Sequence, residues 1–376
     1  MGFTDGPLDG PSDFDPTKLL IKLDGTLLND GADKDALILS NIETKVSCGP
    51  EASICEVVLY ARRQAAAKNK EFSDIKVGKK IKIEIKKSII STEEVFVGYL
   101  FSFSIEIAQD VQILTLMGMD AKMWLMSSKN TKQFEGKKKY SDIVKQIGQS
   151  HPKVTIGTVT ITGEVNLSEP INQIDQSDYD FLCYIAEITG CFFYFEFDEL
   201  FFKNYDKTKG TSVTVTEKLQ IKNVKYTANT LGMLKSAKVI GVNMDNFSEP
   251  IEGTESTGTT LGGGEPATEC VSTFSSSANV LLTTVPNVKS PEEAAFYAKA
   301  LLNKRKIRFV NCVLTVDFNY KLKLLSKITI RCFGDFIDGN YIISAINHIY
   351  NAEERITTLS LISTGINVPS GFSLSF

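Results

Sequence analysis

Residues 174–197 read Ile-Asp-Gln-Ser-Asp-Tyr-Asp-Phe-Leu-Cys-Tyr-Ile-Ala-Glu-Ile-Thr-Gly-Cys-Phe-Phe-Tyr-Phe-Glu-Phe. Ser177 is a favourable helix N-cap, and the carboxylates of Asp178 and Asp180 stand where a first helical turn has free amides. Gly190 stands where a left-handed C-terminal cap is needed, and an aromatic run follows it. Apolar residues recur between the caps at helical spacing, at Phe181, Leu182, Ile185, Ala186 and Ile188. The segment therefore predicts a short capped helix that leads directly into a buried strand.

This helix, glycine and aromatic strand resemble a signature of the phage late control protein D family, the baseplate hub proteins of contractile tails. The N-terminal part of the valine-glycine repeat protein of type VI secretion is similar. Other segments resemble the same family in the same order: Val77–Ile83, Val95–Leu100, Met117–Asp120, Pro291–Leu301, Lys327–Ile330, Gly339–His348 and Arg355–Leu361. The ordered resemblance covers residues 18–364, and that order is harder to obtain by chance than any one motif.

The length and composition suggest a globular protein of two or three domains, because 376 residues exceed one typical core. The formal net charge of −4 gives no general reason to expect nucleic-acid binding. No run of about 18 apolar residues occurs, and the N-terminus lacks a basic and apolar signal sequence. We expect assembly in the bacterial cytoplasm, with exit only by lysis or a machine.

The seven cysteines are odd in number and contain no Cys-x-x-Cys motif. Most lie in apolar runs, as Cys183 and Cys312 do. We interpret them as buried free thiols of a reducing compartment. A disulfide between Cys48 and Cys55, across a turn, is the weaker alternative.

The fold class predicted is mixed, mainly β with an α+β part. An arm over 1–17 precedes alternating strands over 18–120 that predict an antiparallel β-barrel. Residues 121–235 predict a small α+β middle domain, with a helix at 140–148 and a strand pair at 154–165. Residues 236–376 contain a helix at 290–302 and further strands, and resemble the second tube-like barrel of the family. A long mobile loop is expected at about 249–269.

The chain offers little that indicates catalysis. His151 precedes Pro152 and is interpreted as a helix-end residue, and His348 lies in a strand. Gly262-Gly263-Gly264 lacks the Lys-Ser/Thr of a phosphate loop. The lysines at 79–87 and 137–139 lack the clustered arginines and interleaved aromatics of a nucleic-acid site, so a solvated barrel face is favoured, or a channel lining. We assign no catalytic, cofactor-binding or metal-ligating residue and no cofactor.

The resemblance implies a structural hub, not an enzyme, at the tail tip of a phage or of a phage-tail-like particle such as a bacteriocin or an effector-delivery system. It implies a homotrimer in which two barrels per chain match a hexameric tail tube. The implied partners are a tube or tube-initiator ring, a separate central spike, baseplate wedge proteins and a tape measure protein. Nucleic acid would be only passing cargo.

Two alternatives remain open at this point. One is a tail-associated cell-wall hydrolase, which would need paired carboxylates or a metal. The other is a tail tube or sheath-like protein, for which one barrel per chain is expected. Because the sequence stops at Phe376, soon after the last predicted strand, we expect spike and hydrolase functions on other chains.

Overall fold

The computed structural model describes residues 19–29, 37–62, 75–88, 91–108, 111–127, 129–205, 211–217, 221–243, 246, 249–266, 280–284, 288–334 and 336–367. The predicted N-terminal arm over 1–17 lies outside these residues, as does Cys270. The six described cysteines are free thiols, as predicted, and Cys48 and Cys55 are both buried without forming a disulfide.

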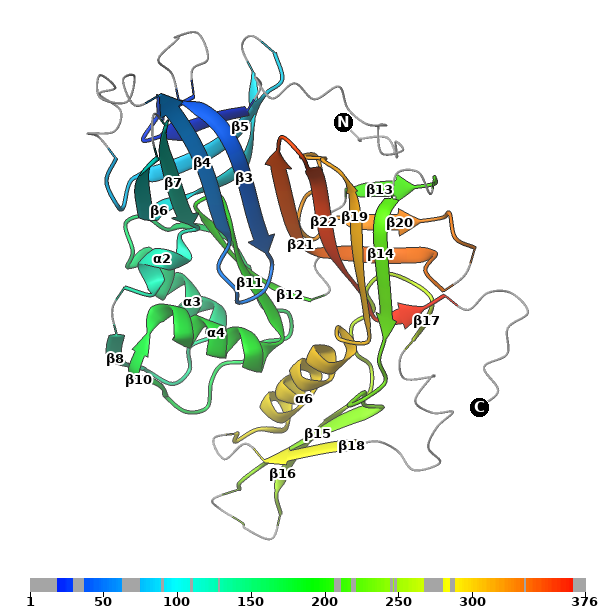
Figure 1. Ribbon diagram of the computed structural model, residues 1–376. Coiled ribbons are helices and arrows are strands. Elements are labelled where there is room, and N and C mark those ends of the chain that lie inside the picture. The colour runs from blue at the N-terminus through cyan, green and yellow to red at the C-terminus, as the bar shows by residue number, and fades with distance from the viewer. Residues whose placement is uncertain are drawn as a thin grey trace.

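Within the described residues, thirteen strands form one large sheet that has two lobes (Figure 1). The first β lobe contains β1 (Leu19–Leu23), β2 (Thr26–Leu27), β3 (Ile38–Ser47), β4 (Ile54–Arg62), β5 (Lys80–Lys86), β6 (Thr92–Ala108) and β7 (Val111–Met119). The second β lobe contains β13 (Ser212–Val215), β14 (Ile221–Ala228), β19 (Val310–Asp317), β20 (Lys327–Ile330), β21 (Gly339–Asn351) and β22 (Arg355–Ser363).

The predicted fold class, mainly β with an α+β part, is confirmed. The strand order is β14-β19-β22-β21-β3-β4-β7-β6-β5-β1-β2, and within the described part of the chain it does not return to its start. The two expected barrels are therefore two lobes of a shared sheet. The pairing is also not wholly antiparallel, because β13 and β20 run parallel.

Each lobe has its own apolar core. In β5 the alternation works as the sequence predicts: Ile81, Ile83 and Ile85 are buried in the first lobe while the intervening residues face away from that core. The second lobe buries a comparable set around Leu314, Ile343 and Leu361. Such alternating strands stabilise a sheet by removing one row of side chains from water.

A small α+β part packs below the first lobe and is built around the segment quoted at the outset. Its elements are α2 (Lys122–Leu125), β8 (Lys129–Phe134), α3 (Tyr140–Gln149), β9 (Thr155–Thr160), β10 (Ile171–Ser177), α4 (Asp178–Thr189), β11 (Cys191–Glu196) and β12 (Glu199–Asn204). Helix α4 has the predicted caps: Ser177 Oγ accepts from the Asp180 amide at 3.0 Å, and Gly190 has φ of 65°. The strand pair expected over 154–165 is wrong, because β9 is one strand that pairs in parallel with β12.

The remaining unit is a three-stranded sheet covered by the longest helix. It contains β15 (Ser236–Gly241), β16 (Ile251–Glu255), β18 (Val280–Thr284) and α6 (Pro291–Lys306). Ser290 caps α6 as predicted, since its Oγ accepts from the Glu293 amide at 3.1 Å. Because β16 pairs with β15, residues 251–255 are strand, and the expectation of a loop there is wrong.

Strands β13 and β14 lie in the segment 121–235 that was predicted as the middle domain, but they pair with β20 and β19. Strand β14 aligns with β19 from Ile221↔Val316 to Ala228↔Val310. The domain boundary predicted between residues 235 and 236 therefore separates β13 and β14 from the strands with which they pair. The second β lobe is thus assembled from two stretches on either side of the β15–α6 unit.

A buried lysine ties the first β lobe to the α+β part. The Lys122 ammonium donates to the carbonyl oxygens of Gly49 at 2.9 Å and Glu51 at 2.6 Å, in the turn between β3 and β4. Burial lowers the pKa of Lys122, while the nearby Asp120 carboxylate acts in the opposite direction. Because a fully buried cation must keep its hydrogen bonds, these carbonyl oxygens hold the turn between β3 and β4 in one conformation.

The helix α4 gives a direct test of this packing. Leu182 and Ile185 are fully buried, so Leu182→Ala and Ile185→Ala should each cost about 2–5 kcal/mol of unfolding free energy. Ser177→Ala should cost about 0.5–2 kcal/mol. Glu187→Ala, on the exposed side of the same helix, is the control and should stay within about 1 kcal/mol. Chemical denaturation measures all four, and a near-zero loss for both core variants would contradict the assigned face.

Candidate functional site

The two β lobes meet at one pair of strands, β3 and β21. Their register runs from Ala345↔Ser47 to Asn351↔Asn41. Side chains continue the pairing, since Asn347 Nδ2 donates to Glu43 Oε1 at 3.2 Å and Asn351 Nδ2 donates to Asn41 Oδ1 at 3.2 Å. This junction, called the seam below, fixes the second lobe against the first as neighbouring strands of one sheet.

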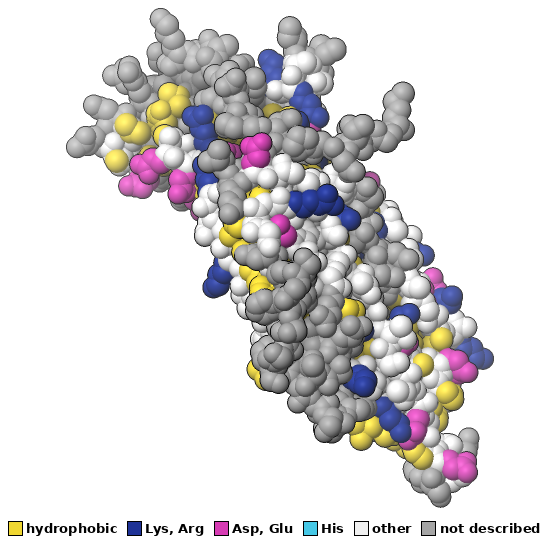
Figure 2. Space-filling model, turned by 90° about the vertical axis from the view of Figure 1, so that its right-hand side faces the viewer, with side chains coloured by type: hydrophobic (Ala, Val, Ile, Leu, Met, Phe, Trp, Pro, Cys, Tyr) yellow, Lys and Arg dark blue, Asp and Glu magenta, His cyan; other side chains and the backbone are white. Residues whose placement is uncertain are grey.

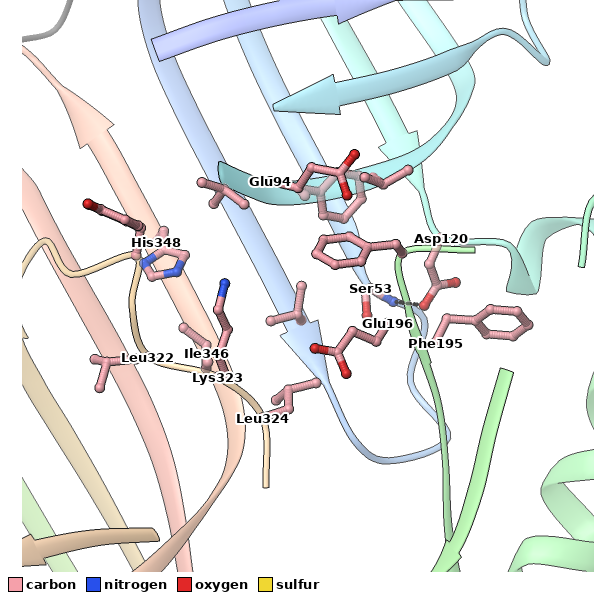
Figure 3. A pocket seen from close by; sticks show the side chains of 16 residues that line it. Ser53, Glu94, Asp120, Phe195, Glu196, Leu322, Lys323, Leu324, Ile346 and His348 are labelled. Atoms are coloured by element: carbon pink, nitrogen blue, oxygen red, sulfur yellow. Dashed lines mark hydrogen bonds between the residues drawn. The ribbon is translucent and has the colours of Figure 1, made fainter. Parts of the chain in front are cut away.

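A small cavity lies beside the seam, where both lobes meet the end of β11 (Figure 3). His348 and Lys323 lie on the side of the second lobe, and Glu94 and Asp120 come from the first lobe. The loop after β19 also crosses the junction: Lys323 Nζ lies 3.0 Å from Glu93 Oε1, and Phe318 packs in the first-lobe core. Burial raises the pKa of Glu93, but hydrogen bonds from Lys87 and Lys323 outweigh it and the pKa is lowered.

His348 is a structural residue of the seam. Its Nδ1 is hydrogen-bonded to Thr357 Oγ1 at 2.9 Å, and its ring packs on Phe318 with centroids 5.2 Å apart. Burial, helped by the positive charge of Lys323, lowers its pKa from 6.5 to about 3. The imidazole is therefore neutral at physiological pH and shielded from solvent, and it lies in a strand, as predicted.

His151 is at the end of α3, as predicted. Its Nε2 lies 2.7 Å from Asp178 Oδ2, at the first residue of α4. The same carboxylate accepts from Gln173 at 2.8 Å and Asn130 at 3.1 Å. Burial alone would raise the pKa of Asp178, but the hydrogen bonds from Gln173 and His151 reverse this and lower it. The histidine joins two helix ends.

The cavity beside the seam is too small for a cell-wall saccharide. Its volume is about 60 Å³, whereas ligand pockets usually measure roughly 300–1,000 Å³. Its acids are already engaged: Glu94 pairs with Lys82 at 2.5 Å, and Asp120 accepts from the Ser53 amide at 2.9 Å. The geometry at this site does not support the hydrolase alternative.

Three lysines in β5 or directly after it form ion pairs. Lys82 pairs with Glu94, Lys80 with Asp198 and Lys87 with Glu93. Opposite charges at such short range neutralise the row, so β5 does not present a continuous basic stripe to a phosphate backbone. On the face that Figure 2 shows, basic and acidic side chains are likewise interspersed.

The glycine run at 262–264 is a packing element. A Cβ on Gly262 would lie 2.3 Å from the Asn340 carbonyl oxygen, and one on Gly264 would lie 2.1 Å from that of Ile366. Both glycines have positive φ, and the adjacent Leu261 exchanges hydrogen bonds with Thr364. The run brings its chain against the second lobe, where β17 (Glu265–Pro266) pairs with β23 (Gly365–Ile366).

The most distinctive exposed surface is the outer half of β6. Strand β5 covers β6 only from Thr92 to Tyr99, and beyond Leu100 no described strand lies on that side. This bare edge carries a row of exposed apolar side chains, with Phe103 at 38 %, Ile105 at 43 % and Ile107 at 56 % exposure. Among the described strands, β14 is likewise paired only on one side, at the other end of the sheet. Open, apolar strand edges are sites where another chain adds.

Among the described residues, no group of three or more His, Cys, Asp or Glu side chains could hold a metal ion. No helix within them is long and apolar enough to cross a membrane.

Solved structures with the same fold include phage tail proteins and a type VI secretion component. A 43 kDa tail protein of prophage MuSo2 from Shewanella oneidensis has a TM-score of 0.65 and 13 % identity, over 92 % of this chain and 98 % of that one. The tail protein from Neisseria meningitidis MC58 has a TM-score of 0.64 and 11 % identity, over 95 % and 99 %. The E. coli c3393 protein, a type VI secretion component with structural similarity to T4 tail proteins gp27 and gp5, has a TM-score of 0.55 and 10 % identity, over 93 % and 79 %.

The fold is therefore that of phage tail and baseplate hub proteins, and the resemblance predicted from the sequence is confirmed at this level. Comparison with curated proteins gave no match. The chain belongs to the Alg8 N-terminal domain family, whose model matches residues 19–352.

The buried His348 predicts a specific dependence of stability on pH. Because its pKa is about 3 in the folded state and 6.5 when unfolded, the unfolded state binds more protons between these values, and stability falls as the pH falls. When the pH falls from about 7 to about 5, the unfolding free energy of the wild type should decrease by on the order of 1–2 kcal/mol more than that of His348→Leu. Urea denaturation at both pH values measures the difference, and equal losses would show that His348 titrates normally.

Proposed function

We propose that this chain is the structural baseplate hub of a contractile tail or of a related injection particle. The proposal rests most on the seam, because it makes two β lobes of one chain into neighbouring parts of a single sheet. Three such chains supply six lobes, which matches the symmetry of a hexameric tail tube. The fold shared with phage tail proteins supports the same role.

In this proposal the protein is a homotrimer with a central channel, at the tail tip. The apolar edge of β6 and the edge of β14 lie at different parts of the sheet. The β6 edge of one copy can therefore pair with the β14 edge of a neighbouring copy. Repeating this contact around a three-fold axis closes a ring. The ring joins the tail tube, or its initiator ring, to a separate spike, with wedge and tape measure proteins as further neighbours.

The test uses the assembled particle. Ile105→Lys combined with Ile107→Lys places two charges on the bare edge of β6, so the hub should no longer enter the tail tip. Folding should be kept, with an unfolding free energy within about 1 kcal/mol of the wild type, because both side chains are exposed. Val77→Lys is the matched control, since Val77 is also exposed but lies in the turn before β5.

Electron microscopy and mass spectrometry of purified particles give the readout. We expect three copies per tail tip for the wild type and for Val77→Lys, and empty or missing tips for the double variant. Six copies per tip would contradict the trimer. Normal incorporation of the double variant would show that the β6 edge is not an assembly surface.

A further inference from the structure

A second, larger pocket lies between α4 and α6 and has no part in the seam. Its volume is about 390 Å³, which is within the range of pockets that bind small groups. Three tyrosines line it: Tyr140 from the start of α3, Tyr184 from α4 and Tyr297 from α6. Leu167, Ile188 and Leu301 add apolar surface.

The pocket exists because the two helices touch closely at one end. A Cβ on Gly190, at the end of α4, would lie 3.0 Å from the Ala300 Cα of α6. Near this contact, Lys304 of α6 forms an ion pair with Glu187 of α4. Beside the N-terminal half of α6, the pocket is lined by residues of the segment 167–171 and by Tyr140. The pocket therefore lies between α4, α6 and the start of α3.

The polar groups of the pocket favour a cation. Three carboxylates line it, those of Glu169, Glu187 and Glu293, against the single ammonium of Lys304. Glu169 and Glu187 each have a lysine partner at the rim. Glu293 differs, because it is only 3 % exposed and no described cation pairs with it. A buried carboxylate without a cation is costly, and an incoming positive charge would offset that cost.

Within the described residues, the hydrogen bonds to the Glu293 carboxylate are all on one oxygen. Its Oε2 accepts from Ser168 Oγ at 2.8 Å and from the Lys289 amide at 3.4 Å, and the described residues give no partner for Oε1. On the same wall, the hydroxyls of Tyr140 and Tyr297 are hydrogen-bonded to each other at 2.6 Å. Tyrosine rings and a carboxylate together make an environment that suits a flat cation.

We propose that this pocket receives the side chain of an arginine presented by a partner protein. The guanidinium group stacks on aromatic faces, is weakly hydrated and donates in a fork that matches a carboxylate, whereas the lysine ammonium is a strongly hydrated point charge. The aliphatic stem of arginine would cover the apolar wall at Leu301 and Ile188. The inference concerns a pocket of the single chain and does not depend on the trimeric hub.

The test uses small probes and the full chain. N-acetyl-arginine methylamide carries the side chain on a peptide-like backbone, and N-acetyl-citrulline methylamide is its uncharged isostere. Ligand-observed NMR titration should show the arginine probe binding at least about tenfold more tightly than the citrulline probe. N-acetyl-leucine methylamide is the apolar control and should bind as weakly as the citrulline probe.

Variants locate the binding. Glu293→Gln removes the charge and keeps the shape, and should weaken the arginine probe about tenfold. Tyr184→Ala, at a side chain 46 % exposed, should weaken it with little risk to folding. Tyr60→Ala, an exposed tyrosine of the first lobe, should leave binding unchanged.

Four results would overturn the proposal. Equal affinity for the arginine and citrulline probes would show that charge is not recognised, and tighter binding of the leucine probe would indicate an apolar occupant. Unchanged binding in Tyr184→Ala would place the probe elsewhere, even if Glu293→Gln failed to fold. Self-association of the chain that Tyr184→Ala abolished would mean that a second copy fills the pocket.

Discussion

The pairing of β3 with β21 is the interaction on which the rest of the structure depends. Two lobes with separate apolar cores become one sheet because Ile42, Ile346 and Tyr350 are buried at that junction. A strand pair fixes spacing and direction far more tightly than packing between two closed barrels would. The edges of β6 and β14 that no described strand covers then have a defined separation. The small cavity with His348 is the space left where three parts meet, and it is not shaped to hold a substrate.

Local signals in the sequence predicted local structure well. Ser177 and Gly190 are a cap pair whose geometry depends on neighbouring residues only, so the ends of α4 could be placed within the sequence. Ser290 with Pro291 defined the start of α6 for the same reason. The overall resemblance to baseplate hubs added the order of elements. What could not be predicted was the choice of partner for a strand, because alternation shows that a strand has a covered face and does not show what covers it.

The candidate surfaces also could not be predicted from the sequence alone. Phe103, Ile105 and Ile107 alternate as a strand should, yet they are exposed, in the half of β6 that lies beyond its pairing with β5. Lys122 is buried although lysine is rarely so, and its partners, among them the turn carbonyls of Gly49 and Glu51, come from distant parts of the chain. Glu293 lies in the first turn of α6, but its place in a tyrosine-lined pocket depends on residues from α3 and α4. Each of these features is created by contacts between distant segments.

The split construction of the second lobe has a consequence for the order of folding during synthesis. All strands of the first lobe and all elements of the α+β part have been synthesised once the ribosome has passed Asn204, so most of their pairing can form early. Their cores are completed later, when Phe296 and Phe318 arrive. Strands β13 and β14 must wait for β19 and β20, and β3 must wait for β21 near the end of the chain. Contacts between residues about 300 positions apart form slowly, because a long loop must close first. A nascent or truncated chain that ends before β21 therefore lacks the paired lobes.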